Sequence, residues 1–282
     1  MDKEEVKRKN TNNGKKIKMT ILYILLVVCI IAIVISLYKI INWFIENNKN
    51  KKIKDELSNA VVIYEENVEN DEENTENQTT KDKSQIYSID FEKLKSQNPD
   101  TVAWLKVNGT DIEFPVVKAN DNYYYLTHSF DRSYNSAGWI FADYSNNFDS
   151  YDRNIVIYGH NRMDGSMFST LKNVLTDEWL NNPENMNIIL ITENEKAVYE
   201  VFSVYQVVVE DYYINTSLFN DNYYQSFLNN IQSRSIRDFG NEVSISDTIL
   251  TLSTCADNMS YRIVVHAKKV NGREADVIED NI

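Results

Sequence analysis

The stretch that decides the fold is "TILTLSTCADNMSYRIVVHAKKV", residues 248–270. It holds two runs of alternating side-chain character, typical of half-buried β-strands, joined by the polar segment "ADNMSY". Because alternate side chains of a strand share a face, Leu250 and Leu252 lie on one face and Cys255 on the other. Antiparallel pairing of the two runs puts Cys255 opposite Arg262, with β-carbons about 4.5–5.5 Å apart. We therefore predict a hairpin that carries a cysteine and an arginine on one face.

An uncharged apolar run, "TILYILLVVCIIAIVISLY", occupies residues 20–38. Together with residues 39–44 it can cross a hydrocarbon core of about 30 Å, at about 1.5 Å per residue. The run is too long for a cleaved signal peptide, and no small-x-small cleavage site follows it. Basic residues precede the run and acidic residues follow it, so the positive-inside rule predicts a cytoplasmic N-terminus. We expect an uncleaved single-pass anchor in the cell membrane, with everything after residue 45 outside the cell.

The two cysteines of the chain lie in different settings. Cys29 falls inside the predicted span, where an apolar filler of a membrane helix is the expected role. Cys255 has no partner on its own side of the membrane, although structural cysteines of extracellular proteins usually pair. Cys255 is therefore an accident, an intermolecular link or a nucleophile.

Composition divides the 282 residues into five segments. We expect a basic cytoplasmic tail at 1–18, a transmembrane anchor at 19–44, a polar acidic linker at 45–84, a folded domain at 85–275 and a C-terminal tail at 276–282. The linker has too few apolar residues to become ordered, and we expect it to be partly helical at most, near "KIKDELSNAVVIYEE". The formal net charge of −13 argues against a general nucleic-acid binder, whose phosphate contacts need a basic face.

The folded domain carries mainly strand signals, with few helical ones. A short helix is expected after its cap Asp90, and helical periods recur at 166–175 and 217–232. Many short strands with brief turns predict a mostly β, closed or nearly closed barrel rather than a parallel α/β sheet. The predicted strands lie in the segments 101–109, 111–117, 138–143, 154–160, 186–192, 197–209, 247–255 and 261–270.

Acyl transfer by a cysteine also needs a proton shuttle, because the leaving amine must be protonated. His160 ends the strand-like run "NIVIYGH" after a glycine and is well placed to reach a groove. In the hairpin register His266 pairs with Thr251, about 13 Å along the strand from Cys255, and a surface position is expected for it. His128 lies in a tyrosine-rich loop and is expected to be incidental, so chain pattern favours His160.

A guanidinium opposite Cys255 has two physical uses. It favours the thiolate over the thiol, and it supplies fixed donors to an oxyanion on an attacked carbonyl. The alternative is that Arg262 only pairs with a nearby acid such as Asp257.

Five motifs of the folded domain occur together: "FEKLKSQNPDTVAWLKVNGTDIEFPVVKANDNYYYLTHSF", "SAGWIFADY", "NIVIYGHNRMDGSMFSTLKN", "TLSTC" and "YRIVVHAKKV". In this combination they resemble class B sortases, membrane-anchored cysteine transpeptidases of Gram-positive bacteria. The resemblance covers roughly residues 86–270, and its motifs occur in the family's order. It implies an eight-stranded barrel with N-terminal helices, a helix before the cysteine strand, and one transmembrane helix.

The resemblance also implies an activity and its residues. The catalytic roles fall on His160, Cys255 and Arg262, and four matching groove positions, expected to bind substrate, are Asn122, Leu126, Tyr158 and Ser253. The implied reaction cleaves an NPxTx-like C-terminal sorting signal of an exported protein after its threonine. A thioacyl-enzyme then passes the protein to an amine of peptidoglycan or of its lipid-linked precursor. No metal or organic cofactor is implied, and the scattered histidines lack metal-ligand spacing.

Other readings remain open at this point. A pilin-polymerising sortase would share the chemistry, and a catalytically inactive, membrane-tethered binding module would share only the fold. Papain-like peptidases and L,D-transpeptidases fit less well, because here the histidine precedes the cysteine and "TLSTC" lacks their motif. Two departures from the class affect the expected substrate preference and the behaviour of the loop after Cys255, more than the basic chemistry. The connection between Cys255 and Arg262 is short, and Ala256 replaces a residue that is often polar.

Overall fold

The structure is a computed structural model that describes residues 3–66, 84–148, 152–255 and 261–270. The chain forms two compact units, Met1–Asn48 and Lys49–Ile282. Helix α1 (Lys3–Leu57) makes up the first unit and continues into the second. Among the described residues, one helix is long and apolar enough to cross a membrane, with a mean hydropathy of 3.1 over its apolar window. This helix contains the predicted anchor.

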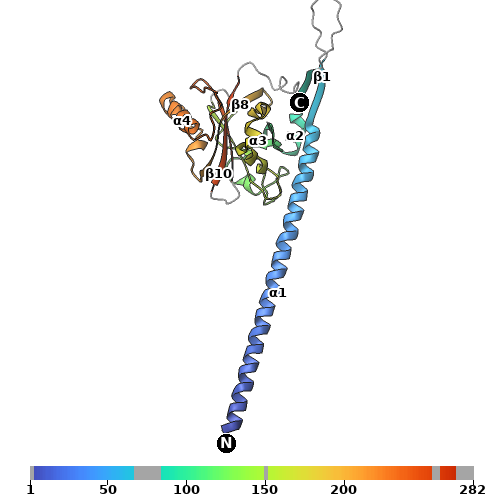
Figure 1. The fold of residues 1–282 in the computed structure, drawn as a ribbon. Helices are drawn as coiled ribbons and strands as arrows, with labels where there is room; N and C mark the ends of the chain where they lie inside the picture. The colour runs from blue at the N-terminus through green and yellow to red at the C-terminus, as the bar shows by residue number, and fades with distance from the viewer. Residues whose placement is uncertain (1–2, 67–83, 149–151, 256–260, 271–282) are drawn as a thin grey trace, which may run out of the picture. The chain divides into compact units, whose positions relative to one another are not determined.

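The second unit is built around a closed barrel of eight strands, as the sequence predicts (Figure 1). The strands follow one another around the barrel in the order β10-β8-β7-β3-β4-β5-β6-β9. Neighbours are antiparallel except for β4 with β5 and β6 with β9, which are parallel. Each predicted run contains one strand: β3 (Thr101–Val107), β4 (Glu113–Val117), β5 (Phe141–Ala142), β6 (Asn154–Gly159), β7 (Asn187–Ile191), β8 (Lys196–Val208), β9 (Ile249–Cys255) and β10 (Tyr261–Lys269).

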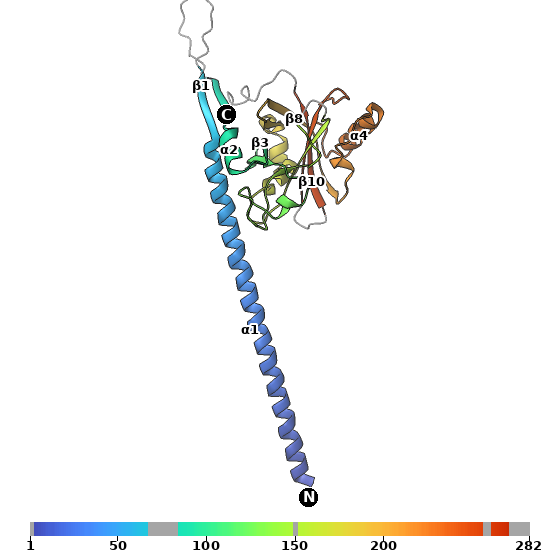
Figure 2. The ribbon, with the colours of Figure 1, turned by 180° about the vertical axis from the view of Figure 1, so that it is seen from behind.

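Strand alternation separates the inside of the barrel from its outer face. Leu250 and Leu252 of β9 lie in the main core, as do Ile263 and Val265 of β10. The opposite face of β8, β9 and β10 is covered by helix α4 (Asp221–Ser233), which lies on one side of the barrel in Figures 1 and 2. A second apolar cluster fills this interface, and it contains Phe202, Tyr205, Val264 and Ile249 of the strands with Tyr224, Phe227, Leu228 and Ile231 of α4.

The remaining helices are short. Helix α2 (Phe91–Gln97) begins after Asp90, whose side chain accepts a hydrogen bond from the Lys93 amide, and this is the predicted cap. The helical period at 166–175 forms a 3₁₀ helix, η3 (Ser169–Leu175), rather than an α-helix. The other short elements are η1 (Ser58–Ala60), η2 (Tyr124–Leu126), α3 (Asp177–Leu180), η4 (Pro183–Met186) and η5 (Tyr212–Ile214).

The expected linker at 45–84 differs from what the structure describes. The second unit already begins at Lys49, within the expected linker. Beyond α1 and η1, strand β1 (Val61–Glu66) pairs with β2 (Ser84–Ile89). Residues 67–83 lie outside the described residues. Leu57 and Ala60 are buried in the main core, and buried Asn50 accepts hydrogen bonds from Ser129 and Asn135. These few buried side chains attach an otherwise charged segment to the catalytic unit. The average composition of the segment does not predict their burial.

Candidate active site

The β9–β10 hairpin has the predicted register. Arg262 pairs with Cys255, and His266 pairs with Thr251. Strand β10 is also bonded to β8 on its other side, where Arg262 faces Val207. The side chain of Cys255 and residues 256–260 lie outside the described part of the chain. The backbone of the predicted nucleophile is therefore placed directly opposite Arg262.

A groove of about 590 Å³ opens at this end of the barrel. Strands β6, β9 and β10 contribute side chains to it, as do η2 and the segment 209–214 that follows β8. Because β6 and β9 are parallel neighbours with Tyr158 opposite Ser253, residues far apart in sequence meet at one edge. The groove is lined by all the predicted site residues whose side chains are described: His160, Arg262, Asn122, Leu126, Tyr158 and Ser253.

His160 follows directly after β6 and is held by one hydrogen bond. Its Nε2–H donates to the carbonyl oxygen of Leu126 at 2.9 Å, which connects β6 to η2 across the groove. Burial lowers the pKa of the His160 imidazole, and the positive charges of Arg162 and Arg262 lower it further, whereas the Leu126 bond opposes the shift. The resting imidazole is therefore neutral at pH 7, with its proton on Nε2.

Arg262 lines the same groove, close enough to His160 to affect its titration. One guanidinium nitrogen, Nη1, donates to the Tyr261 carbonyl at 3.2 Å. A guanidinium carries five N–H donors in a fixed plane, a geometry that suits the binding of a ligand oxygen. Asp257, the alternative partner named from the sequence, lies outside the described residues.

The sequence did not reveal two polar residues at the groove, Tyr213 in its lining and Asp143 behind it. Tyr213 of η5 has its hydroxyl 3.2 Å from Ser253 Oγ. Asp143, which follows β5, accepts hydrogen bonds from both Asn122 and Tyr158. The signal for Asp143 was an acid at the end of the predicted strand "GWIFAD". The sequence did not single out Asp143, because its partners Asn122 and Tyr158 lie 21 residues before it and 15 residues after it.

His266 is not a surface residue, so that expectation is wrong. It is fully buried, with its ring nitrogens 2.8 Å from Tyr205 Oη and 2.9 Å from Thr251 Oγ1. Burial lowers the pKa of His266 to about 3. Strand parity placed it correctly on the outer face, but helix α4 covers that face. His128 stacks on Tyr124 at 4.0 Å between ring centroids and does not line the groove.

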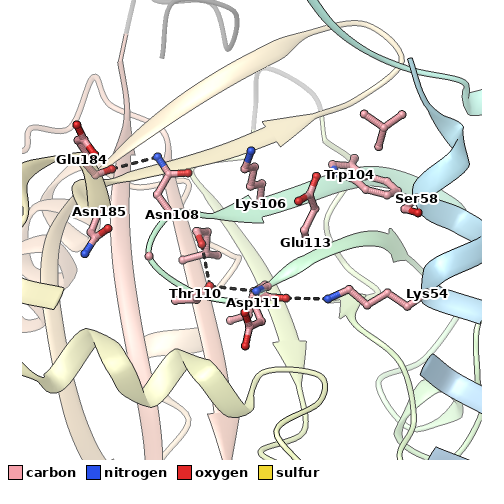
Figure 3. Close-up of a pocket in the computed structure, with 14 residues that line it drawn as sticks. Lys54, Ser58, Trp104, Lys106, Asn108, Thr110, Asp111, Glu113, Glu184 and Asn185 are labelled. Carbon is pink, nitrogen blue, oxygen red and sulfur yellow. Dashed lines mark hydrogen bonds between the residues drawn. The ribbon is translucent and has the colours of Figure 1, made fainter. Parts of the chain in front are cut away.

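A second pocket, of about 720 Å³, lies elsewhere on the barrel, against the end of α1 (Figure 3). Lys54 reaches into it and donates to the Asp111 carbonyl at 2.8 Å, and Lys106 and Glu113 also line it. Its described lining contains neither a cysteine nor a histidine. Within the described residues, no group of three His, Cys, Asp or Glu side chains could hold a metal ion. The groove at His160 and Arg262 is therefore the candidate active site.

Known proteins share this fold. The sortase domain family matches residues 105–270. Sortase B of Staphylococcus aureus is 32% identical over 255 residues, covering 89% of this chain and 96% of that protein. The crystal structure of Clostridium perfringens sortase B has a TM-score of 0.61 at 39% identity, over 64% of this chain and all of that one. A Staphylococcus aureus sortase B–substrate complex gives 0.61 at 34% identity, over 65% and 86%.

The domain match covers more than half of the chain, and the full-length relative exceeds 30% identity over nearly all of its length. The closed eight-stranded barrel agrees with that similarity. The chain therefore belongs to class B of the sortase family and is a cysteine transpeptidase.

Proposed function

We propose that this chain cleaves a C-terminal sorting signal of the NPxTx type after its threonine and joins the exported protein to an amine of the cell wall. The observation that carries the proposal is the groove itself. It brings His160 and Arg262 together at the end of the strand whose last residue is Cys255. The solved Staphylococcus aureus sortase B–substrate complex supports a substrate partner for this chain.

In the first step, the Cys255 thiolate attacks the threonyl carbonyl carbon and forms a carbon–sulfur bond. The carbonyl oxygen becomes an oxyanion, to which the Arg262 guanidinium donates hydrogen bonds. The carbon–nitrogen bond then breaks, and the departing amine takes a proton from the His160 imidazolium. The products are a thioacyl-enzyme, a free amine and a neutral His160.

In the second step, an amine of a cell-wall peptide attacks the thioacyl carbon. His160 takes the proton that the amine loses, and the carbon–sulfur bond breaks to regenerate the thiolate. The net reaction exchanges one amide for another, so no oxidant or reductant is needed. Because burial lowers the pKa of His160, the imidazolium is the minor form at neutral pH, and its formation contributes to the barrier.

The walls of the groove select the peptide in this proposal. Asn122, Leu126, Tyr158 and Ser253 all line it, and they come from the segment before η2, from η2 itself, from β6 and from β9. Leu126 offers apolar contact, whereas the other three offer hydrogen bonds. A single extended peptide crossing the groove would meet all four on its way to Cys255.

The anchor helix fits a membrane location for this reaction. We infer that α1 crosses the cell membrane once, with the basic N-terminus in the cytoplasm and the catalytic unit outside. The acceptor amine would then belong to peptidoglycan or its lipid-linked precursor, both of which occur on that side.

The test uses the full-length chain in detergent micelles with a panel of NPxTx-like peptides. Each peptide is incubated with the enzyme and no acceptor, with a cell-wall peptide amine, or with a peptide that carries a pilin-type lysine. The masses of the products are measured by mass spectrometry. Cleavage after threonine and ligation to the cell-wall amine are expected. Preferred ligation to the lysine peptide would indicate a pilin-polymerising enzyme, and an absence of cleavage across the panel would contradict the proposal.

A further inference from the structure

Asp143 lies behind the groove wall rather than in the groove lining. It follows β5 directly, and its backbone amide donates to the Val156 carbonyl on β6 at 2.9 Å. Its side chain is only 6% exposed. A buried carboxylate is costly unless its oxygens are hydrogen-bonded, so its bonds show how the site stabilises it.

Both carboxylate oxygens of Asp143 accept hydrogen bonds. Oδ2 accepts from Asn122 Nδ2 and from Tyr158 Oη, each at 2.8 Å. Oδ1 accepts from the Ser145 amide at 3.0 Å and from the Ser145 hydroxyl at 2.6 Å. The Ser145 hydroxyl is also 2.8 Å from Thr216 Oγ1, in the segment between η5 and α4. One carboxylate therefore connects three segments around the groove.

The direction of these bonds determines what the groove offers to a ligand. An ionised carboxylate only accepts, so the Tyr158 hydroxyl must donate to it and its oxygen lone pairs remain as acceptors. Asn122 uses one amide hydrogen on Asp143, while its Oδ1 accepts from the Tyr144 amide at 3.0 Å. The amide orientation is thereby fixed, and its second N–H is left as a donor. Both residues line the groove.

We propose that Asp143 is a positioning residue that sets the hydrogen-bond polarity of the groove, with an acceptor at Tyr158 and a donor at Asn122. A peptide fits when it presents an N–H to Tyr158 and a carbonyl to Asn122, and the reverse pairing leaves both groups unsatisfied. Burial and the Asp143 carboxylate together raise the pKa of Tyr158, so its hydroxyl keeps the proton that it donates. The identity of the ligand as a sorting peptide rests on the proposed function.

The experiment replaces Asp143 with asparagine in the full-length chain. The shape is retained, but an amide has only one acceptor oxygen, so it cannot accept on both sides as the carboxylate does. With that oxygen on the Ser145 amide, the new NH2 faces Tyr158, and the Tyr158 hydroxyl must turn its hydrogen elsewhere. For a peptide that the wild type processes, we expect KM to rise about 10- to 100-fold, with kcat changing less than KM. Asp152→Asn is the matched control, because Asp152 accepts loop hydrogen bonds but does not line the groove, and its KM should be unchanged.

A chain that already lacks both groove partners of Asp143 distinguishes a positioning role from a general effect on the structure. In a Tyr158→Phe, Asn122→Ala chain, Asp143→Asn has nothing left to orient, so its effect on KM should fall to less than about threefold. The full effect persisting in that background would overturn the proposal. If Asp143→Asn fails to fold, Tyr158→Phe alone still decides, because an unchanged KM would show that the phenol acceptor is not used.

A spectroscopic readout does not depend on turnover. In protein labelled with ¹³C at the tyrosine Cζ position, Asp143→Asn should shift the Tyr158 signal and leave the Tyr224 signal in place. An unchanged Tyr158 signal would overturn the proposal even if no sorting peptide is cleaved. Failure of the wild type to process any peptide would instead contradict the proposed function alone.

Discussion

Cys255 and Arg262 are direct partners across the antiparallel pair of β9 and β10. Each strand is also held on its other side, β9 by β6 and β10 by β8, so this pair lies within a closed sheet and not at an open edge. The backbone of the proposed nucleophile is thereby fixed opposite the proposed oxyanion donor. Such preorganised donors stabilise a developing charge without reorganisation during the reaction.

Replacing Arg262 tests the oxyanion role. Arg262→Gln should lower kcat by about 10²–10³-fold, because a preorganised charged donor is lost. Arg262→Lys keeps the charge but loses the planar set of donors, so we expect only partial recovery. Steady-state kinetics on a sorting peptide give both values. Arg153→Lys is the control, since Arg153 pairs with Asp221 away from the groove, and an equal loss in that variant would contradict the assignment.

The titration of His160 tests the electrostatics of the groove. The pKa of His160 should lie below 6.5, because burial and two neighbouring arginines disfavour its charged form. Arg162→Gln removes one of these positive charges and should raise that pKa, and the imidazolium fraction at neutral pH should rise with it. Imidazole NMR titrations of both proteins measure the shift. A wild-type midpoint above 6.5, or a lower midpoint in Arg162→Gln, would contradict this picture.

The buried His266 predicts an acid-dependent loss of stability. Its pKa is about 3 in the folded state and about 6.5 when unfolded, so the unfolded chain binds the extra proton between these values. The free energy of unfolding should therefore fall as pH drops through this window, by at most about 1.4 kcal/mol per pH unit from this group. His266→Gln keeps hydrogen-bonding groups but cannot titrate, so its stability should fall less steeply. Denaturant unfolding of residues 49–282 at several pH values makes the comparison, and parallel curves would contradict the prediction.

The end of α1 should contribute to the stability of the catalytic unit. Leu57 is 1% exposed and lies in the main core, so Leu57→Ala should cost about 2–4 kcal/mol in the free energy of unfolding. Lys52→Ala, on the exposed side of the same helix, should change it by less than about 0.5 kcal/mol. Denaturant unfolding of a fragment that begins at Lys49 measures both. Equal losses of unfolding free energy in Leu57→Ala and Lys52→Ala would mean that this segment does not pack on the barrel in solution.

Strand parity made much of the fold predictable from the sequence. Alternating residues located all eight barrel strands. The hairpin register that pairs Cys255 with Arg262 was an assumption consistent with this parity, and the structure confirms it. The sequence could predict those site residues that lie at the ends of strands. His160 and Arg262 lie at such ends, and both line the groove. The family resemblance supplied Asn122 and Leu126, which no strand pattern would have selected.

The features that could not be predicted depend on contacts between distant segments. His266 sits on a polar strand face, and its burial follows only from where α4 packs. The proposed role of Asp143 depends on its hydrogen bonds with Asn122 and Tyr158, which come from different segments of the chain. The docking of residues 49–66 rests on Asn50, Leu57 and Ala60 within a charged segment, where average polarity predicted a linker.

In the proposed reaction, Cys255 forms a thioacyl bond to a sorting peptide. Intact-mass measurement can detect this bond on the catalytic unit from Lys49 onward, mixed with an NPQTN-like peptide, with wild type, Cys255→Ala and His160→Ala run side by side. We expect an adduct of the peptide cleaved after threonine in the wild type, and none in Cys255→Ala. An adduct that survives in Cys255→Ala, or a wild type that forms none across a panel of sorting peptides while Cys255 also resists a thiol reagent, would contradict the proposed reaction.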